Sequence, residues 1–177
     1  MTQRSKSSAK TAPIPRRGKK SWREKLEDDK DLPRAIPLRD GTGEMIIAAP
    51  REVDALMRHV PRGKLTTIDS LRAALAARHG TDTACPITTG IFAWLAAHAA
   101  DEADEADEAA AAGTRDITPY WRTLRAKGEV NPKYPGGLAA ITTRLEAEGH
   151  EVFQKGKLTF VRDYEKALAP ASAFRKK

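Results

Sequence analysis

Residues 50–80 read PREVDALMRHVPRGKLTTIDSLRAALAARHG, and the spacing of their apolar side chains decides the fold. The first part predicts a helix, because four apolar residues recur at the spacing of one helix face: Val53, Leu56, Met57 and Val60. The Pro-Arg-Gly that follows ends this helix. Thr66 or Thr67 then caps a second helix, which stops at Gly80.

A third helix is predicted to begin at Pro86, whose fixed φ suits a first turn, and to run to about Ala100. Its apolar residues are Ile87, Ile91, Trp94 and Leu95. The second and third helices, joined by a turn that contains Gly80, form a candidate helix-turn-helix. A helical hairpin that binds nothing has the same spacing, so the pattern leaves both interpretations open.

The N-terminal part is predicted to lie outside this domain. Residues 1–20 carry seven Lys or Arg, no acid and almost no apolar side chains, which predicts a disordered basic tail. Residues 21–44 form a linker, in which Ser21–Leu26 is predicted as a short helix anchored by Trp22. Prolines and glycines break any regular structure in the rest of the linker, at Pro33, Pro37, Gly41 and Gly43.

An acidic insert, residues 101–113, follows the third helix and contains the run DEADEADE. It is predicted either to extend that helix or to form a loop. In both cases we expect its carboxylates to be solvated and directed away from any phosphate backbone, because like charges repel.

The fold class predicted is α+β, a winged-helix-like helix-turn-helix domain with a small β-hairpin, over residues 45–165. Its remaining parts are a strand at Met45–Ile47, an extended segment at 117–125, a loop at 131–137, a helix from Leu138 to Gly149, and a hairpin of Val152–Phe153 with Leu158–Val161 that completes the sheet. Residues 166–177 are a basic C-terminal tail.

Composition narrows the class of protein. With 31 Lys and Arg against 24 Asp and Glu, the net charge is +7, which favours polyanionic partners through phosphate neutralisation. The single cysteine, Cys85, excludes an internal disulfide and a multi-cysteine zinc site, and four scattered histidines predict no metal site. Neither a long apolar run nor a secretory leader is present. We expect a cytoplasmic monomer without cofactor or membrane association.

Three segments carry recognisable motifs: VPRGKLTT at 60–67, PYWR at 119–122, and YPGG at 134–137 followed by RLEAEG at 144–149. In this order they resemble the I-P-x-G-K-V-x-[ST] segment, the P-C-H-R or P-W-[HW]-R motif, and the glycine loop with its R-L-x-x-E-G helix. These belong to the alkylguanine-DNA alkyltransferases and their catalytically silent relatives, the alkyltransferase-like proteins. The resemblance spans about residues 45–153.

This resemblance implies that alkyl transfer is absent. In the enzymes the motif cysteine is the nucleophile, and a histidine and a glutamate favour its thiolate. Here Tyr120 stands at the cysteine position and Trp121 at the histidine position, whereas Arg122 and Glu148 match. A phenol with a pKa of about 10 is a poor acceptor at neutral pH. Tyr120, Trp121 and Glu148 are expected to line a pocket for an alkylated base, with aromatic packing in the core as the competing interpretation.

The resemblance also implies that the helix from Pro86 enters the DNA minor groove. Ile87 stands near the position of the family's arginine finger, and Ile68 stands at the position of its tyrosine. The two isoleucines would then form an apolar wedge in place of these residues, unless the isoleucines pack in the core. The other residues expected at DNA are Arg62, Lys64, Thr66, Thr67, Arg78, Thr88, Thr89, Gly90 and Arg122. For the cations the alternative is solvated surface, and Arg122 also suits a role in bracing the motif strand.

We therefore expect a non-enzymatic protein that binds double-stranded DNA, recognises alkylated or distorted guanine, and recruits a protein of a repair pathway. A regulatory or nonspecific DNA binder is the alternative, and the two differ in whether Tyr120 and Trp121 leave an open pocket. A third candidate is a methyltransferase that uses Cys85, whose place at a helix N-terminus would lower its thiol pKa. A structural, buried cysteine competes with that interpretation.

Overall fold

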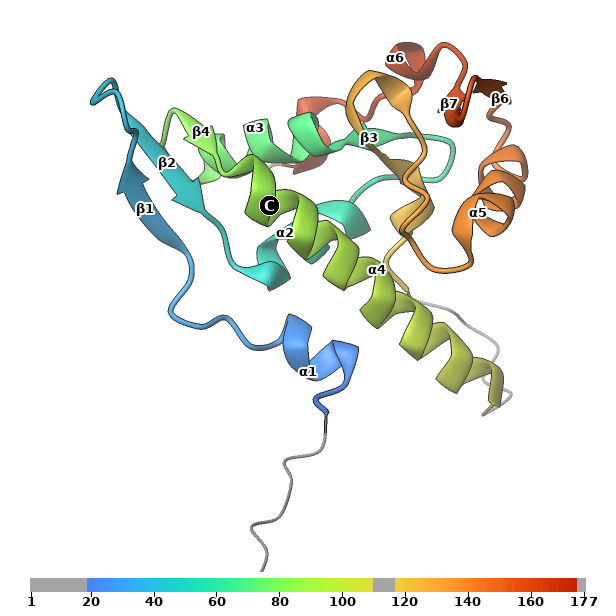
Figure 1. Ribbon diagram of the computed structural model, residues 1–177, viewed down its shortest axis with the longest axis horizontal. Helices are drawn as coiled ribbons and strands as arrows, with labels where there is room; N and C mark the ends of the chain where they lie inside the picture. Colours follow the sequence, from blue (N-terminus) through green and yellow to red (C-terminus); the bar gives the residue numbers. More distant parts are fainter. Residues whose placement is uncertain (1–18, 110–116, 175–177) are drawn as a thin grey trace, which may run out of the picture.

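Helices and short strands alternate along the chain, which confirms the α+β class. The computed structural model describes residues 19–109 and 117–174 (Figure 1). The helices are α1 Trp22–Leu26, α2 Pro50–Arg58, α3 Ile68–His79, α4 Pro86–Ala109, α5 Gly137–Glu146 and α6 Tyr164–Ala167. The strands are β1 Arg34–Pro37, β2 Glu44–Ile47, β3 Thr66–Thr67, β4 Thr83–Ala84, β5 Thr123–Leu124, β6 Val152–Lys155 and β7 Leu158–Val161. Three short 3-10 helices are η1 Tyr120–Arg122, η2 Ala126–Gly128 and η3 Ala171–Phe174.

The first three helices predicted in the domain begin where their sequence signals place them. The hydroxyl of Thr67 accepts a 3.1 Å hydrogen bond from the amide of Ser70 and so caps α3. Gly80 ends α3 with a φ of 65°, a left-handed conformation that glycine adopts without a Cβ clash. A short turn and β4 then lead into α4 at Pro86.

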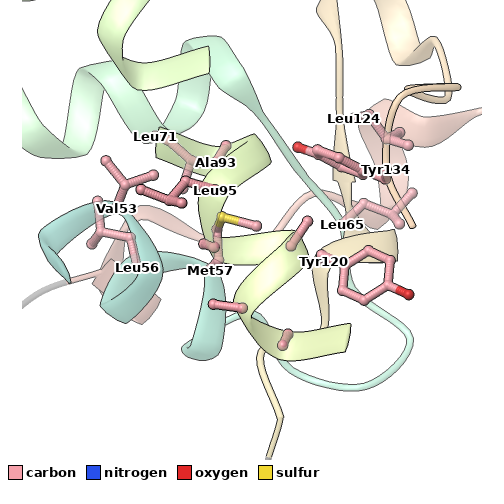
Figure 2. Close-up of a cluster of buried hydrophobic side chains, with 14 of the residues drawn as sticks. Val53, Leu56, Met57, Leu65, Leu71, Ala93, Leu95, Tyr120, Leu124 and Tyr134 are labelled. Carbon is pink, nitrogen blue, oxygen red and sulfur yellow. The ribbon is translucent and has the colours of Figure 1, made fainter. Parts of the chain in front are cut away.

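The core lies where α2, α3 and α4 meet (Figure 2). Val53, Leu56 and Met57 of α2 are fully buried there with Leu71 of α3 and Ala93 of α4. Burial of each large aliphatic side chain stabilises the fold by about 1.5–3 kcal/mol. This cluster fixes α3 and α4 to the rest of the domain.

The sheet differs from the prediction in two places. The linker was expected to lack regular structure before Met45, but β1 pairs antiparallel with β2, with Arg34 opposite Ile47. Pro37 is tolerated because β1 is an edge strand, where a missing N–H leaves no ladder bond unmade. The hairpin of β6 and β7 forms a separate two-stranded sheet and does not complete the one that contains β2.

The acidic insert extends α4 to Ala109, but the prediction of a fully solvated acidic face is wrong. The carboxylate of Glu102 accepts hydrogen bonds from the amides of Trp22 and Arg23, at 3.4 and 3.0 Å, at the start of α1. Asp104 is only 6% exposed and pairs with Arg144 of α5 at 3.0 Å. Unpaired helix N–H groups and an opposite charge attract these acids into the protein.

Several expectations fall on parts of the chain that the structure does not describe. These are most of the basic tail, residues 110–113 of the acidic insert, and the last three residues. Within residues 19–109 and 117–174, none of the helices has the length and apolar character needed to cross a membrane. The same residues contain no group of three or more His, Cys, Asp or Glu side chains placed to hold a metal ion.

Candidate nucleic-acid interface

Tyr120, which the resemblance placed at the motif cysteine, lies in the core with 2% of its surface exposed. Its ring makes edge contacts with Trp121 and Tyr134, at centroid distances of 5.5 and 5.9 Å. Burial raises the pKa of the Tyr120 phenol above its ordinary value. The phenol is therefore neutral at physiological pH. Its ring packs against Trp121, the next residue of η1, and against Tyr134 in the loop that precedes α5.

Glu148 accepts hydrogen bonds from two other segments of the chain. Its carboxylate accepts from Nε and Nη2 of Arg122, each at 2.8 Å, from Nε1 of Trp121 at 2.9 Å, and from the amide of Gly63 at 3.1 Å. Burial acts to raise the pKa of Glu148, but the hydrogen bonds from Arg122, Trp121 and Gly63 outweigh it, so the pKa lies below its ordinary value. An ionised carboxylate thus joins the loop after α2 to η1 and to the end of α5.

Arg122 takes the bracing role and is turned away from solvent. Its side chain is 13% exposed, and Nη1 donates to the carbonyl of Val60 at 2.7 Å in addition to the bonds with Glu148. The guanidinium is consequently committed to contacts inside the protein.

The three residues expected to line a base pocket, Tyr120, Trp121 and Glu148, are brought together but fill the space between them. The guanidinium of Arg144 lies over the Trp121 ring, 4.6 Å from the ring centroid, and is itself paired with Asp104. Two surface hollows of about 740 and 460 Å³ lie among the described residues, and none of these three side chains is in their walls. In this conformation the ring of Tyr120 is buried, whereas Trp121 is half-buried.

The N-terminal end of α4, in contrast, presents apolar side chains to solvent. Ile87 is 71% exposed and Ile91 is 51% exposed, one helical turn apart. Gly90 lies between them, and a Cβ placed there would meet no atom within 4 Å. Core packing is therefore excluded for Ile87, whereas Ile68 packs partly buried against the core. Sequence analysis assigned Ile91 to the apolar stripe of the third helix and missed its exposure.

Cys85 lies immediately before α4 and is half-buried and free. Burial acts to raise the pKa of the thiol, but hydrogen bonds from the side chain and amide of Thr88 and from the amide of Ile87 lower it below the ordinary value. Thr89 is buried, and its hydroxyl donates to the carbonyl of Cys85 at 2.7 Å. Of the small residues expected near the DNA backbone, Thr88 and Gly90 are the ones that remain partly accessible.

The remaining residues expected at DNA divide by exposure. Arg62 and Lys64 lie exposed on the loop between α2 and α3, and Arg62 donates to the carbonyl of Ala147 at 3.0 Å. Thr66 and Thr67 are buried in the parallel pair with β5, so their side chains support the fold. Arg78 is half-buried in the wall of the larger hollow.

Two arginines with structural roles were missed by the sequence analysis. Arg72 of α3 donates to the carbonyl of Ala84 at 2.9 Å and to the hydroxyl of Thr83 at 3.1 Å, and so fixes the turn that leads into α4. Arg144 holds the acidic part of α4 against the aromatic motif. The acidic run itself was the available signal, since a carboxylate drawn into a protein needs a cationic partner.

Comparison with family models and with curated proteins gave no match. Two solved structures are similar to this chain. One is S. pombe Atl1 in complex with damaged DNA containing O6-carboxymethylguanine, and the other is S. pombe ATL in complex with DNA. Each aligns with a TM-score of 0.46 and 16% sequence identity, over 68% of this chain and 94% of the other.

Proposed function

We propose that this chain binds double-stranded DNA and transfers no alkyl group, with the N-terminal end of α4 as an apolar wedge. The observation that carries the proposal is the exposure of Ile87 and Ile91 on that end of the helix. Exposed Arg62 and Lys64, on the loop that leads into α3, supply cations for the phosphates. Wedges of this kind enter the minor groove and partly unstack a base step.

The energies of insertion and unstacking are of the same order. Full burial of an isoleucine contributes about 1.5–3 kcal/mol, of which roughly two-thirds is still available at Ile87 because 71% of its surface is exposed. Unstacking one base step costs a few kcal/mol, and it costs least at a mismatched or damaged base. Insertion therefore selects alkylated or otherwise distorted guanine sites without requiring a pocket that reads the base.

The arrangement at the motif supports the non-enzymatic part of the proposal. A buried, neutral Tyr120 is a poor nucleophile, and the carboxylate of Glu148 is engaged by Arg122 and Trp121. Cys85 belongs to a different segment, where its thiol accepts hydrogen bonds at the start of α4. Recruitment of a repair-pathway protein by a monomer on DNA completes the proposed role.

The competing function is a regulatory DNA binder without preference for damage. The burial of Tyr120 favours it, because a buried ring offers no face to an extruded base. The two functions share the wedge and differ in discrimination between intact and damaged duplex.

Equilibrium binding to two duplexes that differ in one O6-methylguanine tests the proposal. We expect tighter binding to the alkylated duplex, and a loss of roughly tenfold for Ile87→Ser, in line with about 1.4 kcal/mol of lost burial. Ile87→Leu is the matched control, since it retains the apolar volume and should bind like the parent. Equal affinity of the parent for both duplexes would assign the regulatory function instead, and no loss for Ile87→Ser would reject the wedge.

A further inference from the structure

The β6–β7 hairpin has an outer face that the core does not cover. Its register pairs Phe153 with Phe160 and Gln154 with Thr159. Side chains alternate between the two faces of a strand, and the buried Thr159 and Val161 mark the inner face. Phe153 and Phe160 therefore lie on the outer face.

The two phenylalanines on this face stack on each other. Their ring centroids are 5.8 Å apart with an interplanar angle of 28°. Both are half-buried, yet neither belongs to the partly buried side chains that pack against the core. Leu158, on the same face, is 46% exposed. Exposed aromatic surface outside the core is typical of a binding site, because it lowers the free energy only when a partner covers it.

One cation contacts these rings, and two more lie at the hairpin turn. The guanidinium of Arg162 lies 5.0 Å from the centre of the Phe153 ring, and Lys155 and Lys157 are exposed on either side of the hairpin turn. The acids nearby are engaged by arginines. The carboxylate of Glu151 pairs with Arg162 at 2.7 Å. Glu129, whose backbone forms an isolated β-bridge with Phe160, pairs through its carboxylate with Arg125 at 2.5 Å. The outer face thus combines stacked aromatic rings with the positive charge of Lys155, and Lys157 lies in the adjoining turn.

We propose that this outer face binds unpaired bases of a single-stranded nucleic acid. A base has two apolar faces that stack on phenylalanine, and its phosphates pair with lysine and arginine. A protein partner would match the rings but gives no reason for cations on both sides of the turn. Bases within a duplex are stacked on each other and do not offer these faces, so the site is distinct from the wedge on α4 and does not depend on it.

The test separates stacking from charge by using two oligonucleotides with the full-length protein. Binding of a thymidine oligomer of about 12 nucleotides is compared with an abasic oligomer of the same length, which has the same phosphates but no bases. Cations anywhere in the chain bind both oligomers alike. We expect the thymidine oligomer to bind about tenfold more tightly, and Phe153→Ser and Phe160→Ser each to reduce that difference severalfold.

Controls keep the outcome independent of the wedge and of folding. Ile87→Ser should keep the preference for the thymidine oligomer. The double variant Lys155→Gln and Lys157→Gln should bind both oligomers more weakly. Photocrosslinking of the unaltered protein with a 5-iododeoxyuridine oligomer should label the peptide that contains residues 152–161. This experiment does not depend on the folding of any variant. Equal binding of the two oligomers, or crosslinks that fall only on other segments, would overturn the proposal even if duplex binding by α4 holds.

Discussion

Replacing Glu148 by glutamine keeps the size of the side chain but removes the negative charge to which Arg122, Trp121 and Gly63 donate hydrogen bonds. The Glu148 side chain is 4% exposed and that of Arg122 is 13% exposed, so the guanidinium would remain charged with little access to water. Removing one partner of a buried ion pair costs about 3–5 kcal/mol. The carbonyl of Val60 still accepts from Arg122, so we expect the lower end, about 3 kcal/mol.

Urea unfolding followed by circular dichroism measures this loss. With an m-value of about 2 kcal/mol per molar urea, the midpoint of Glu148→Gln should fall by about 1.5 M at neutral pH. Glu146→Gln, an exposed change of the same charge on α5, is the matched control and should stay within about 0.5 kcal/mol of the parent. Adding Arg122→Met to Glu148→Gln removes the positive charge that lacks its carboxylate partner. The double variant should recover part of the lost free energy of unfolding.

The pH dependence of this effect has a definite sign. The pKa of Glu148 is lower in the folded protein than in the unfolded chain, where it is about 4.3. Its contribution is therefore complete above the unfolded pKa and is lost as pH falls through the folded pKa. The stability gap between the parent and Glu148→Gln should narrow in acid. A loss under about 1 kcal/mol at neutral pH, the level of an exposed pair, would refute the assignment of Glu148 as the partner of Arg122.

Three further outcomes are expected. No labelled methyl group should move from O6-methylguanine DNA to the protein, and Tyr120→Cys should not restore efficient transfer because its neighbour is Trp121 and not a histidine. Labelling that disappears in Cys85→Ala would contradict this. Asp104→Asn should lower the free energy of unfolding by about 1–3 kcal/mol because it leaves Arg144 without its charge partner, whereas the exposed Glu105→Gln should not. Lys64→Ala should reduce the slope of log affinity for duplex against log salt by about 1, and an unchanged slope would remove Lys64 from the interface.

Local signals account for what the sequence predicted well. The spacing of Val53, Leu56 and Met57, the cap at Thr67 and the stop at Gly80 are each read within one helical turn, and the structure has α2 and α3 at those places. The motif resemblance likewise placed Trp121 and Glu148 together, although they are 27 residues apart along the chain.

Nonlocal contacts account for the differences. The strand β1 exists because it pairs with β2, and no property of the residues around Pro37 indicates that partner. Asp104 is buried because Arg144 meets it from another helix. Ile87 fits an apolar helical stripe and becomes exposed because no other element covers the first turn of α4 among the residues described.

The claim that α4 inserts an apolar wedge is tested most directly by base unstacking. A duplex that carries 2-aminopurine beside an O6-methylguanine becomes more fluorescent when the aminopurine loses its stacking partner. At saturating protein the parent should raise this fluorescence, and Ile87→Ser, compared at its own saturation, should raise it much less, while Ile87→Leu behaves like the parent. A parent protein that saturates the duplex without unstacking the aminopurine, or an Ile87→Ser variant that unstacks it equally well, would contradict the wedge.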